Sequence, residues 1–173
     1  MRRNFPFVSQ HDSMECGVAC LAMICSYFKK NKSMNYLSEQ CFATTEGVSL
    51  LAIDKVASQL GLETISGRVS VNTICNLENP CILHWNQNHF VVLYKVKKGK
   101  TFYIADPGKG LVKYNLEEFK KHWVSTQSDG EEKGHHLCDI GIADWCILYT
   151  LSRNHQCKYT DDKCQSRHNI HSL

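Results

Sequence analysis

Apolar residues in the first third of the chain recur at the spacing of amphipathic helices. The longest stretch of this kind, residues 15–30, follows a polar run and ends in two lysines, which suit the negative end of a helix. A shorter helix is expected over residues 36–41. A third is expected over residues 50–60, where Ser49 is a candidate N-cap and Gly61 a candidate C-cap.

Beyond this helical region the pattern changes to short apolar runs separated by turn residues. The sequence Asp106-Pro107-Gly108 and the lysine-rich residues 97–100 are typical of turns between strands. Helices followed by a hairpin-rich sheet indicate an α+β fold. Strands are expected over residues 62–71, 80–85, 89–96, 101–105 and 110–114, and Asn115 precedes a helix expected over residues 116–122.

The pattern weakens after about residue 130. Residues 134–173 carry five histidines and four cysteines without a clean period. Residues 140–151 could form one more strand or helix, and residues 153–173 have the polar character of a loose tail. We therefore expect one domain over residues 1–133 and an atypical C-terminal segment over residues 134–173.

The composition is that of a globular protein with a sizeable core, since 43% of residues are hydrophobic and 21% are charged. A net charge of +3 without a dense basic run does not indicate a nucleic-acid partner. No apolar run reaches the roughly 18 residues of a membrane span. Polar residues follow Val8 at once, so the apolar core of a signal peptide is missing and we expect a cytoplasmic protein.

Ten cysteines in a short chain raise the question of a disulfide framework. Several of them lie inside apolar runs, where a reduced thiol behaves as a small core residue. We therefore expect reduced thiols. The cysteines in such runs are Cys20, Cys25, Cys81 and Cys146.

Cys16 differs from these by its position at the start of the first expected helix. Backbone N–H groups at a helix start lower the pKa of a thiol and make it a better nucleophile. A histidine at the beginning of a strand, His89, is a candidate base, and Asp106 at the end of the next strand could orient it. Gln10, just upstream, could join the Cys16 N–H as an oxyanion donor.

Three ordered motifs carry a resemblance to a known family. The segments QHDSMECGVACLAMI, CILHWNQNHFVVLYKV and FYIADPGKG closely resemble the bacteriocin-processing cysteine peptidases. These are papain-like domains found at the N-terminus of peptidase-containing ABC transporters, and sometimes alone. The resemblance implies that Cys16 is the nucleophile, His89 the general base and acid, Asp106 the orienting group and Gln10 the oxyanion donor.

The resemblance also implies a substrate and partners. The family removes leaders from secreted peptide precursors after a Gly-Gly or Gly-Ala pair and recognises the leader as an amphipathic helix. Membrane and ATPase domains of an ABC transporter would be partners, at the cytosolic face of the inner membrane, and no metal or organic cofactor is implied. Residues near the glycine-binding cleft would be Trp85, Asn86 and Asn88. Residues 134–173 depart from the family pattern.

Two other classes of function remain as alternatives. The chain could be a leader-binding module that recruits precursors without cleaving them, although the presence of Cys16 argues against this. It could also be a metal protein, with His155, Cys157, Cys164 and His168 as ligands, but their spacing fits no compact zinc site well. Without the family motifs, Cys16 would be equally interpretable as a buried core thiol, and His84 suits a core or a supporting position.

Overall fold

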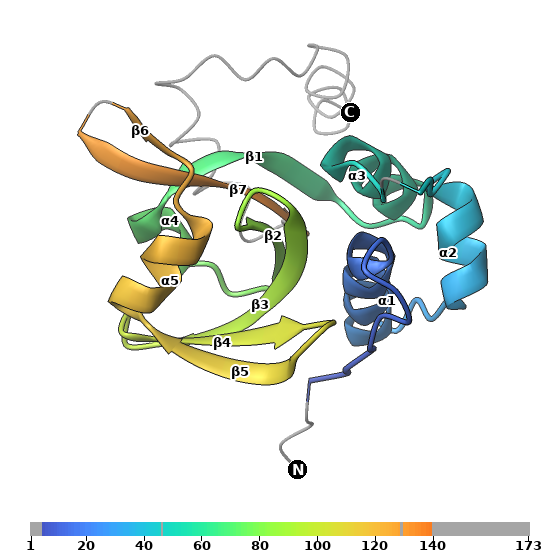
Figure 1. Cartoon of the computed structure of the whole chain (residues 1–173), viewed down its shortest axis with the longest axis horizontal. Coiled ribbons are helices and arrows are strands. Elements are labelled where there is room, and N and C mark those ends of the chain that lie inside the picture. The colour runs from blue at the N-terminus through green and yellow to red at the C-terminus, as the bar shows by residue number, and fades with distance from the viewer. Residues whose placement is uncertain (1–4, 46, 129, 140–173) are drawn as a thin grey trace, which may run out of the picture. The chain divides into compact units, whose positions relative to one another are not determined.

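The computed structural model describes residues 5–45, 47–128 and 130–139 of the chain. The chain divides into two units, Met1–Gly141 and Ile142–Leu173, and the described residues belong to the first. Three helices come first, and the strands follow with two further short helices between them (Figure 1). The helices are α1 (Cys16–Tyr27), α2 (Met34–Gln40), α3 (Leu50–Gln59), α4 (Val71–Cys75) and α5 (Leu116–Trp123).

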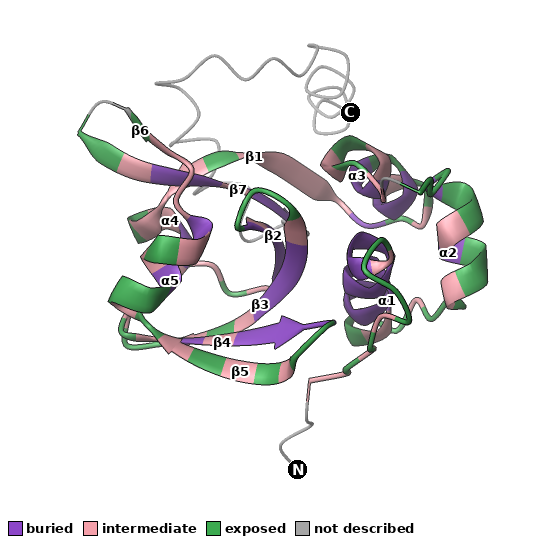
Figure 2. Ribbon diagram, viewed as in Figure 1, coloured by how far each residue is buried: buried purple, intermediate pink, exposed green. Residues whose placement is uncertain are grey.

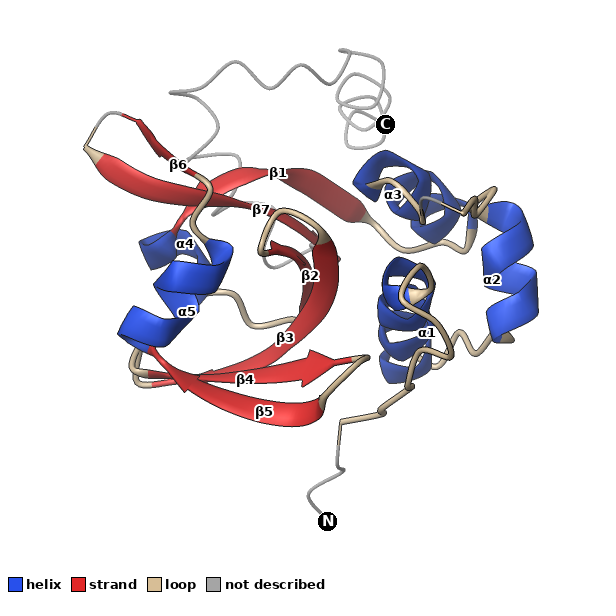
Figure 3. Ribbon diagram, viewed as in Figure 1, coloured by secondary structure: helices blue, strands red, loops and turns tan. Residues whose placement is uncertain are grey.

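The strands of the described region form one antiparallel sheet in the order β1-β7-β2-β3-β4-β5, with β6 paired to β7 (Figure 3). The last strand along the chain, β7, therefore lies between β1 and β2. The strands are β1 (Thr64–Ser70), β2 (Cys81–Trp85), β3 (His89–Lys97), β4 (Thr101–Asp106), β5 (Gly110–Asn115), β6 (Thr126–Ser128) and β7 (Glu131–Asp139).

Helix α1 is the centre of the core on one face of the sheet. Every residue from Cys16 to Cys25 is buried (Figure 2), because this helix is apolar on all sides. It packs against α2 and α3 as well as against β3. Its core neighbours include Leu37, Ile53, Val56, Ile82, Val92 and Leu137. The start of α1 is thereby held against the sheet.

A second group of buried side chains surrounds α5. The rings of Phe102 and Phe119 stack with centroids 4.0 Å apart. The buried Trp123 donates a hydrogen bond from Nε1 to the carbonyl of His135, at 3.0 Å. Asn115 and Glu118 form a reciprocal capping box, which defines the first turn of α5. This helix therefore ties β4 and β5 to β7.

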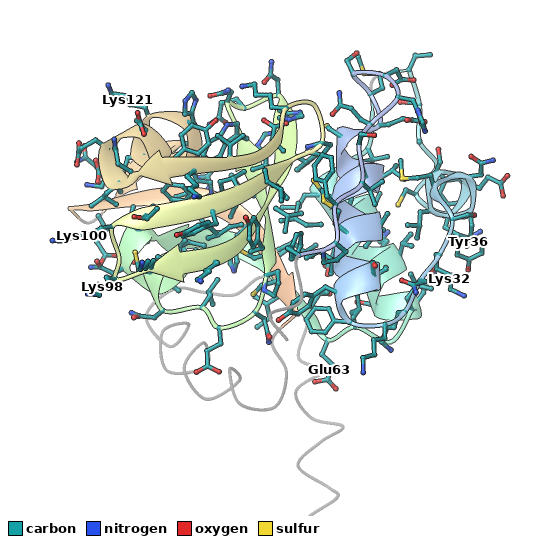
Figure 4. All side chains as sticks on the ribbon, turned by 90° about the horizontal axis from the view of Figure 1, so that it is seen from below. Lys32, Tyr36, Glu63, Lys98, Lys100 and Lys121 are labelled. Atoms are coloured by element: carbon teal, nitrogen blue, oxygen red, sulfur yellow. The ribbon has the colours of Figure 1, made fainter. Side chains whose placement is uncertain are left out.

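Long polar side chains lie at the two edges of the described region. Lys98, Lys100 and Lys121 lie at the strand edge, away from the first three helices, and Lys32 and Tyr36 lie at the helical edge (Figure 4). No helix among the described residues is long and apolar enough to cross a membrane.

The expected α+β class is confirmed, and the expected helices and strands agree with the observed ones to within about three residues. Helix α4 and strands β6 and β7 were not anticipated. The expected domain boundary at residue 133 falls inside β7, which continues to Asp139. Its sequence, EEKGHHLCD, is mostly polar, so it does not resemble a strand that is paired on both sides. The elements expected beyond residue 140 lie outside the described residues.

Candidate active site

Cys16 is the first residue of α1, and a polar loop leads into it. Glu15 occupies the N-cap position but does not cap the helix with its side chain; its carboxylate accepts a hydrogen bond from the His11 N–H at 3.0 Å. The first N–H groups of a helix have no acceptor within it. One of them, from Gly17, hydrogen-bonds to Cys16. Cys16 is only 7% exposed.

His89 and Asp106 come together because β3 and β4 form an antiparallel hairpin and both residues lie at its open end. Nε2 of His89 and Oδ1 of Asp106 are 2.8 Å apart, and Asp106 is 1% exposed. The same Oδ1 accepts the Gly108 N–H at 2.9 Å. Burial alone would raise the pKa of Asp106, but the hydrogen bonds from His89 and Gly108 lower it, so the carboxylate is charged.

The side chain of His89 also hydrogen-bonds to Cys16. Since Nε2 is engaged by Asp106, Nδ1 is the nitrogen left for the sulfur. Burial would raise the pKa of Cys16, but hydrogen bonds from His89, the Phe90 N–H and the Gly17 N–H bring it below its usual value. The bonds to Asp106 and then to Cys16 raise the pKa of His89 to about 9. These opposite shifts, with the pKa of the thiol lowered and that of the imidazole raised, favour the thiolate–imidazolium pair.

Other cysteines have the opposite environment. Burial raises the pKa of Cys20 and Cys81 well above the usual value, and raises the pKa of Cys25 and Cys41 to about 11. All four are free thiols in the structure. These thiols are core residues, and they show that the environment of Cys16 is not a general property of the cysteines in this chain.

Gln10 lies beside the turn that follows β4. Its N–H donates to the Pro107 carbonyl at 3.1 Å, and its side chain lies next to Gly108, two residues beyond Asp106. Its Oε1 is buried and has no hydrogen-bond partner among the described residues. The structure thus brings Gln10 to the same end of the sheet as His89 and Asp106.

A cleft of about 730 Å³ lies over the sulfur of Cys16. One wall comes from the loop before α1 and the segment leading into α3, and the other from β2, β3, β7 and the β2–β3 turn. Cys16, Asn88 and Phe90 all line it. Its other lining residues are Ser13, Met14, Gly47, Val48, Ser49, Leu50, His84, Gln87 and His135.

The residues expected near the cleft divide between two faces of the sheet. Asn88 lines the cleft, whereas Trp85 is 1% exposed and its ring packs against Phe119 and His122 on the α5 side. The side chain of Asn86 is also turned to this side, where its Oδ1 is 2.8 Å from Nδ1 of His122. Trp85 and Asn86 therefore support the β2–β3 turn and do not line the cleft.

Two histidines line the cleft although neither was among the expected site residues. His84 comes from β2 and His135 from β7, with ring centroids 6.3 Å apart. Side chains alternate between the two faces of a strand, so the neighbours His84 and Trp85 point to opposite faces of the sheet. The sequence does not show which face α1 covers, and so it could not place His84 in the cleft. His135 gave no signal because β7 was not anticipated. No group of three metal-ligating side chains occurs among the described residues, and the zinc set considered in the tail lies outside them.

A buried helix that begins with a thiol, packed on an antiparallel sheet that carries a paired histidine and carboxylate, is the arrangement of papain-like cysteine peptidases. Residues 4–127 match the Peptidase C39 family, and the chain belongs to this family of cysteine peptidases.

Similar proteins include secretion proteins and excised peptidase domains. The chain is 37% identical over 125 residues to the colicin V secretion/processing ATP-binding protein CvaB of Escherichia coli, covering 72% of this chain. It is 33% identical over 125 residues to the lactococcin-G-processing and transport ATP-binding protein LagD of Lactococcus lactis, covering 69% of this chain. The match spans only 18% of the length of each of these two relatives.

Two solved structures share the fold. One is a double glycine motif protease from an AMS/PCAT transporter in complex with the leader peptide, with a TM-score of 0.66 and 37% identity. The match covers 78% of this chain and 89% of that one. The other is the peptidase domain of Streptococcus ComA, with a TM-score of 0.67 and 25% identity, covering 78% and 96% of the two chains.

Proposed function

We propose that this chain cleaves secreted peptide precursors after a Gly-Gly or Gly-Ala pair and so releases their leader, with Cys16, His89, Asp106 and Gln10 as its catalytic residues. The observation that carries the proposal is the Cys16–His89–Asp106 contact chain, in which hydrogen bonds lower the pKa of the thiol and raise that of the imidazole. The double glycine motif of a 37% identical protease supports the choice of substrate.

In the proposed reaction the thiolate of Cys16 attacks the carbonyl carbon of the second glycine, and the carbonyl electrons move to its oxygen. The Cys16 N–H and the Gln10 amide donate to this oxyanion. As the C–N bond breaks, His89 gives its proton to the leaving amine, and a thioester joins Cys16 to the leader. Neutral His89 then deprotonates a water molecule, whose attack releases the leader acid and restores the thiolate.

The residue after the nucleophile, Gly17, is packed closely against residues that line the cleft. A Cβ atom at Gly17 would lie 2.3 Å from Cγ2 of Val48 and 3.1 Å from the ring of Phe90. Both of these residues line the cleft beside Cys16. A side chain at Gly17 would therefore push these cleft residues out of place. A Gly-Gly pair in the substrate offers no side chain to bind, so affinity for the precursor has to come from contacts farther along the leader.

The same relatives support a proposal for the partners and the location of this chain. Both curated relatives are named as ATP-binding secretion or transport proteins, and this chain matches only 18% of their length. We infer that it works with the membrane and ATPase domains of an ABC transporter at the cytosolic face of the membrane, on precursors whose leaders form amphipathic helices. The lowered pKa of Cys16 favours cleavage over mere leader binding.

The substrate proposal is tested with a synthetic precursor that carries a helical leader and a Gly-Gly site. The purified chain is expected to cut it once, after the second glycine, as read by mass spectrometry. Replacing that second glycine by valine in the peptide should abolish cleavage, because the proposed specificity is for glycine and a β-branched side chain next to the scissile carbonyl would hinder the approach of the Cys16 thiolate. Equal cleavage of both peptides would contradict the proposal.

The dependence of the reaction on pH follows from the raised pKa of His89. Its imidazolium persists up to about pH 9 and is needed to protonate the leaving amine. We expect kcat/KM for the Gly-Gly precursor to fall about tenfold for each pH unit above about 9. Initial rates between about pH 5 and pH 11 check this. A rate that keeps rising through that range, as for an isolated thiol, would show that His89 does not act as the acid.

A further inference from the structure

The turn between β2 and β3 contains two residues in an unfavourable backbone conformation. Trp85 pairs with His89, so the turn consists of Asn86, Gln87 and Asn88. Asn86 has a φ of 51° and Gln87 a φ of 64°, both in the left-handed region that favours glycine. Such a conformation persists only where neighbouring groups hold it.

His122 of α5 holds one side of this turn. The Asn86 N–H donates to the His122 carbonyl at 2.8 Å, and Asn86 Oδ1 is 2.8 Å from His122 Nδ1. The ring of His122 also stacks on Trp85 with centroids 5.1 Å apart. These contacts fix the first turn residue from the side of α5.

His84 holds the other side of the turn, within the cleft. Its side chain hydrogen-bonds to the backbone carbonyl of Gln87, the second left-handed residue. Its ring also lies 5.2 Å from that of Phe90, centroid to centroid, because the two residues are cross-strand partners. His84 therefore contacts the chain both just before and just after His89.

Two of the groups that contact the sulfur of Cys16 follow directly after this turn. The side chain of His89 and the backbone N–H of Phe90 both hydrogen-bond to Cys16. If the two left-handed residues relaxed to an ordinary conformation, the direction of the chain into β3 would change. Both contacts with the sulfur would then lengthen, whereas the helix that carries Cys16 would stay in place.

We propose that His84 is a positioning residue of this peptidase: its bond to the Gln87 carbonyl and its contact with Phe90 keep the strained turn in place, so that His89 and the Phe90 N–H meet the sulfur of Cys16. The proposal rests on the proposed function only in that Cys16 and His89 are the reacting pair. Nothing in it requires His84 to touch the substrate or to exchange a proton during the reaction.

The test is the pH profile of Cys16 alkylation by iodoacetamide, which reports the thiolate without any substrate. His84→Leu keeps an apolar contact with Phe90 but removes the hydrogen-bond donor. We expect the midpoint of its profile to rise by about one pH unit, so that labelling at about pH 6 falls roughly tenfold. His84→Asn supplies a side-chain N–H again and should recover most of the rate. Mass spectrometry of the Cys16 peptide separates this thiol from the others.

His135→Leu is the matched control. His135 is a half-buried histidine of the same cleft, and its ring lies 6.3 Å from that of His84, centroid to centroid. Its Nε2 accepts a hydrogen bond from Arg68 at 2.8 Å, on the side of β1. The midpoint of its alkylation profile should shift much less than that of His84→Leu, because this variant keeps the bond between His84 and the Gln87 carbonyl. In peptide cleavage, His84→Leu should lower kcat and leave KM unchanged, since a positioning residue acts on the reacting pair and not on leader binding.

A profile for His84→Leu that matches the unchanged protein, at equal melting temperature, would overturn the proposal. If this variant melts early, His84→Ala, which only removes atoms, makes the same comparison. A different result would contradict the proposed function without contradicting the role of His84. A shifted profile in a protein that cuts no Gly-Gly peptide would reject that substrate and leave the role of His84 standing.

Discussion

Replacing Cys16 by alanine is expected to lower kcat/KM for a Gly-Gly precursor by a factor of about 10⁴ or more. The variant keeps the cleft and the His89–Asp106 pair but has no atom that can form the thioester. Water would have to attack the carbonyl directly, with only the oxyanion donors and substrate binding left to help it. Leader binding should persist, because it depends on contacts away from the sulfur.

Cys20→Ala is the matched control, since it makes the same chemical change one helical turn away. Cys20 is fully buried, and its raised pKa keeps it a neutral thiol. Its removal should cost about 1 kcal/mol of stability through a small cavity and leave kcat/KM within about threefold. Cleavage that survives in Cys16→Ala, or that is lost in Cys20→Ala at equal stability, would show that the nucleophile is another thiol.

Much of the site could be predicted because its residues lie at the ends of elements with strong local patterns. Cys16 begins an apolar helix, His89 begins an apolar strand, and Asp106 precedes a proline-containing turn. Pairing of β3 with β4 as a hairpin needs only a short turn between them, so the approach of His89 and Asp106 follows from local structure. The structure then adds the Phe90 N–H, which no side-chain pattern could reveal.

Two features could not be predicted, the face of β2 that lines the cleft and the strand β7, because both depend on contacts between segments far apart in the chain. Trp85 and His84 are neighbours in β2, and alternation sends one to α5 and the other to the cleft. Which of the two faces the cleft is decided by where α1 packs, and the sequence of β2 does not contain this information. The mostly polar strand β7 is likewise stabilised by its pairing with β1 and β2 and by Trp123, and its apolar contribution to the core is limited to Leu137 and Cys138 near its end.

The second large expected effect is a loss of stability in Gly134→Ala. Gly134 lies in β7, where this strand passes Trp123 of α5. A Cβ atom at Gly134 would lie 2.5 Å from Cε2 of Trp123 and 2.6 Å from the Trp123 carbonyl oxygen. The indole is fully buried, its Nε1 is bonded to the His135 carbonyl, and a backbone oxygen cannot move aside. Overpacking of this kind should lower the free energy of unfolding by about 3 kcal/mol.

Gly67→Ala provides the comparison within the same pair of strands. Gly67 lies in β1, opposite His136 of β7, and a Cβ atom there would meet nothing within 4 Å. Because both glycines are strand residues, the gain in chain entropy from alanine is similar at the two positions, and Gly67→Ala should be neutral or slightly stabilising. Thermal unfolding should therefore show a melting temperature about 10 °C lower for Gly134→Ala than for Gly67→Ala. Equal melting temperatures would mean that the chain folds without β7 against α5, and would support the expected domain boundary at residue 133.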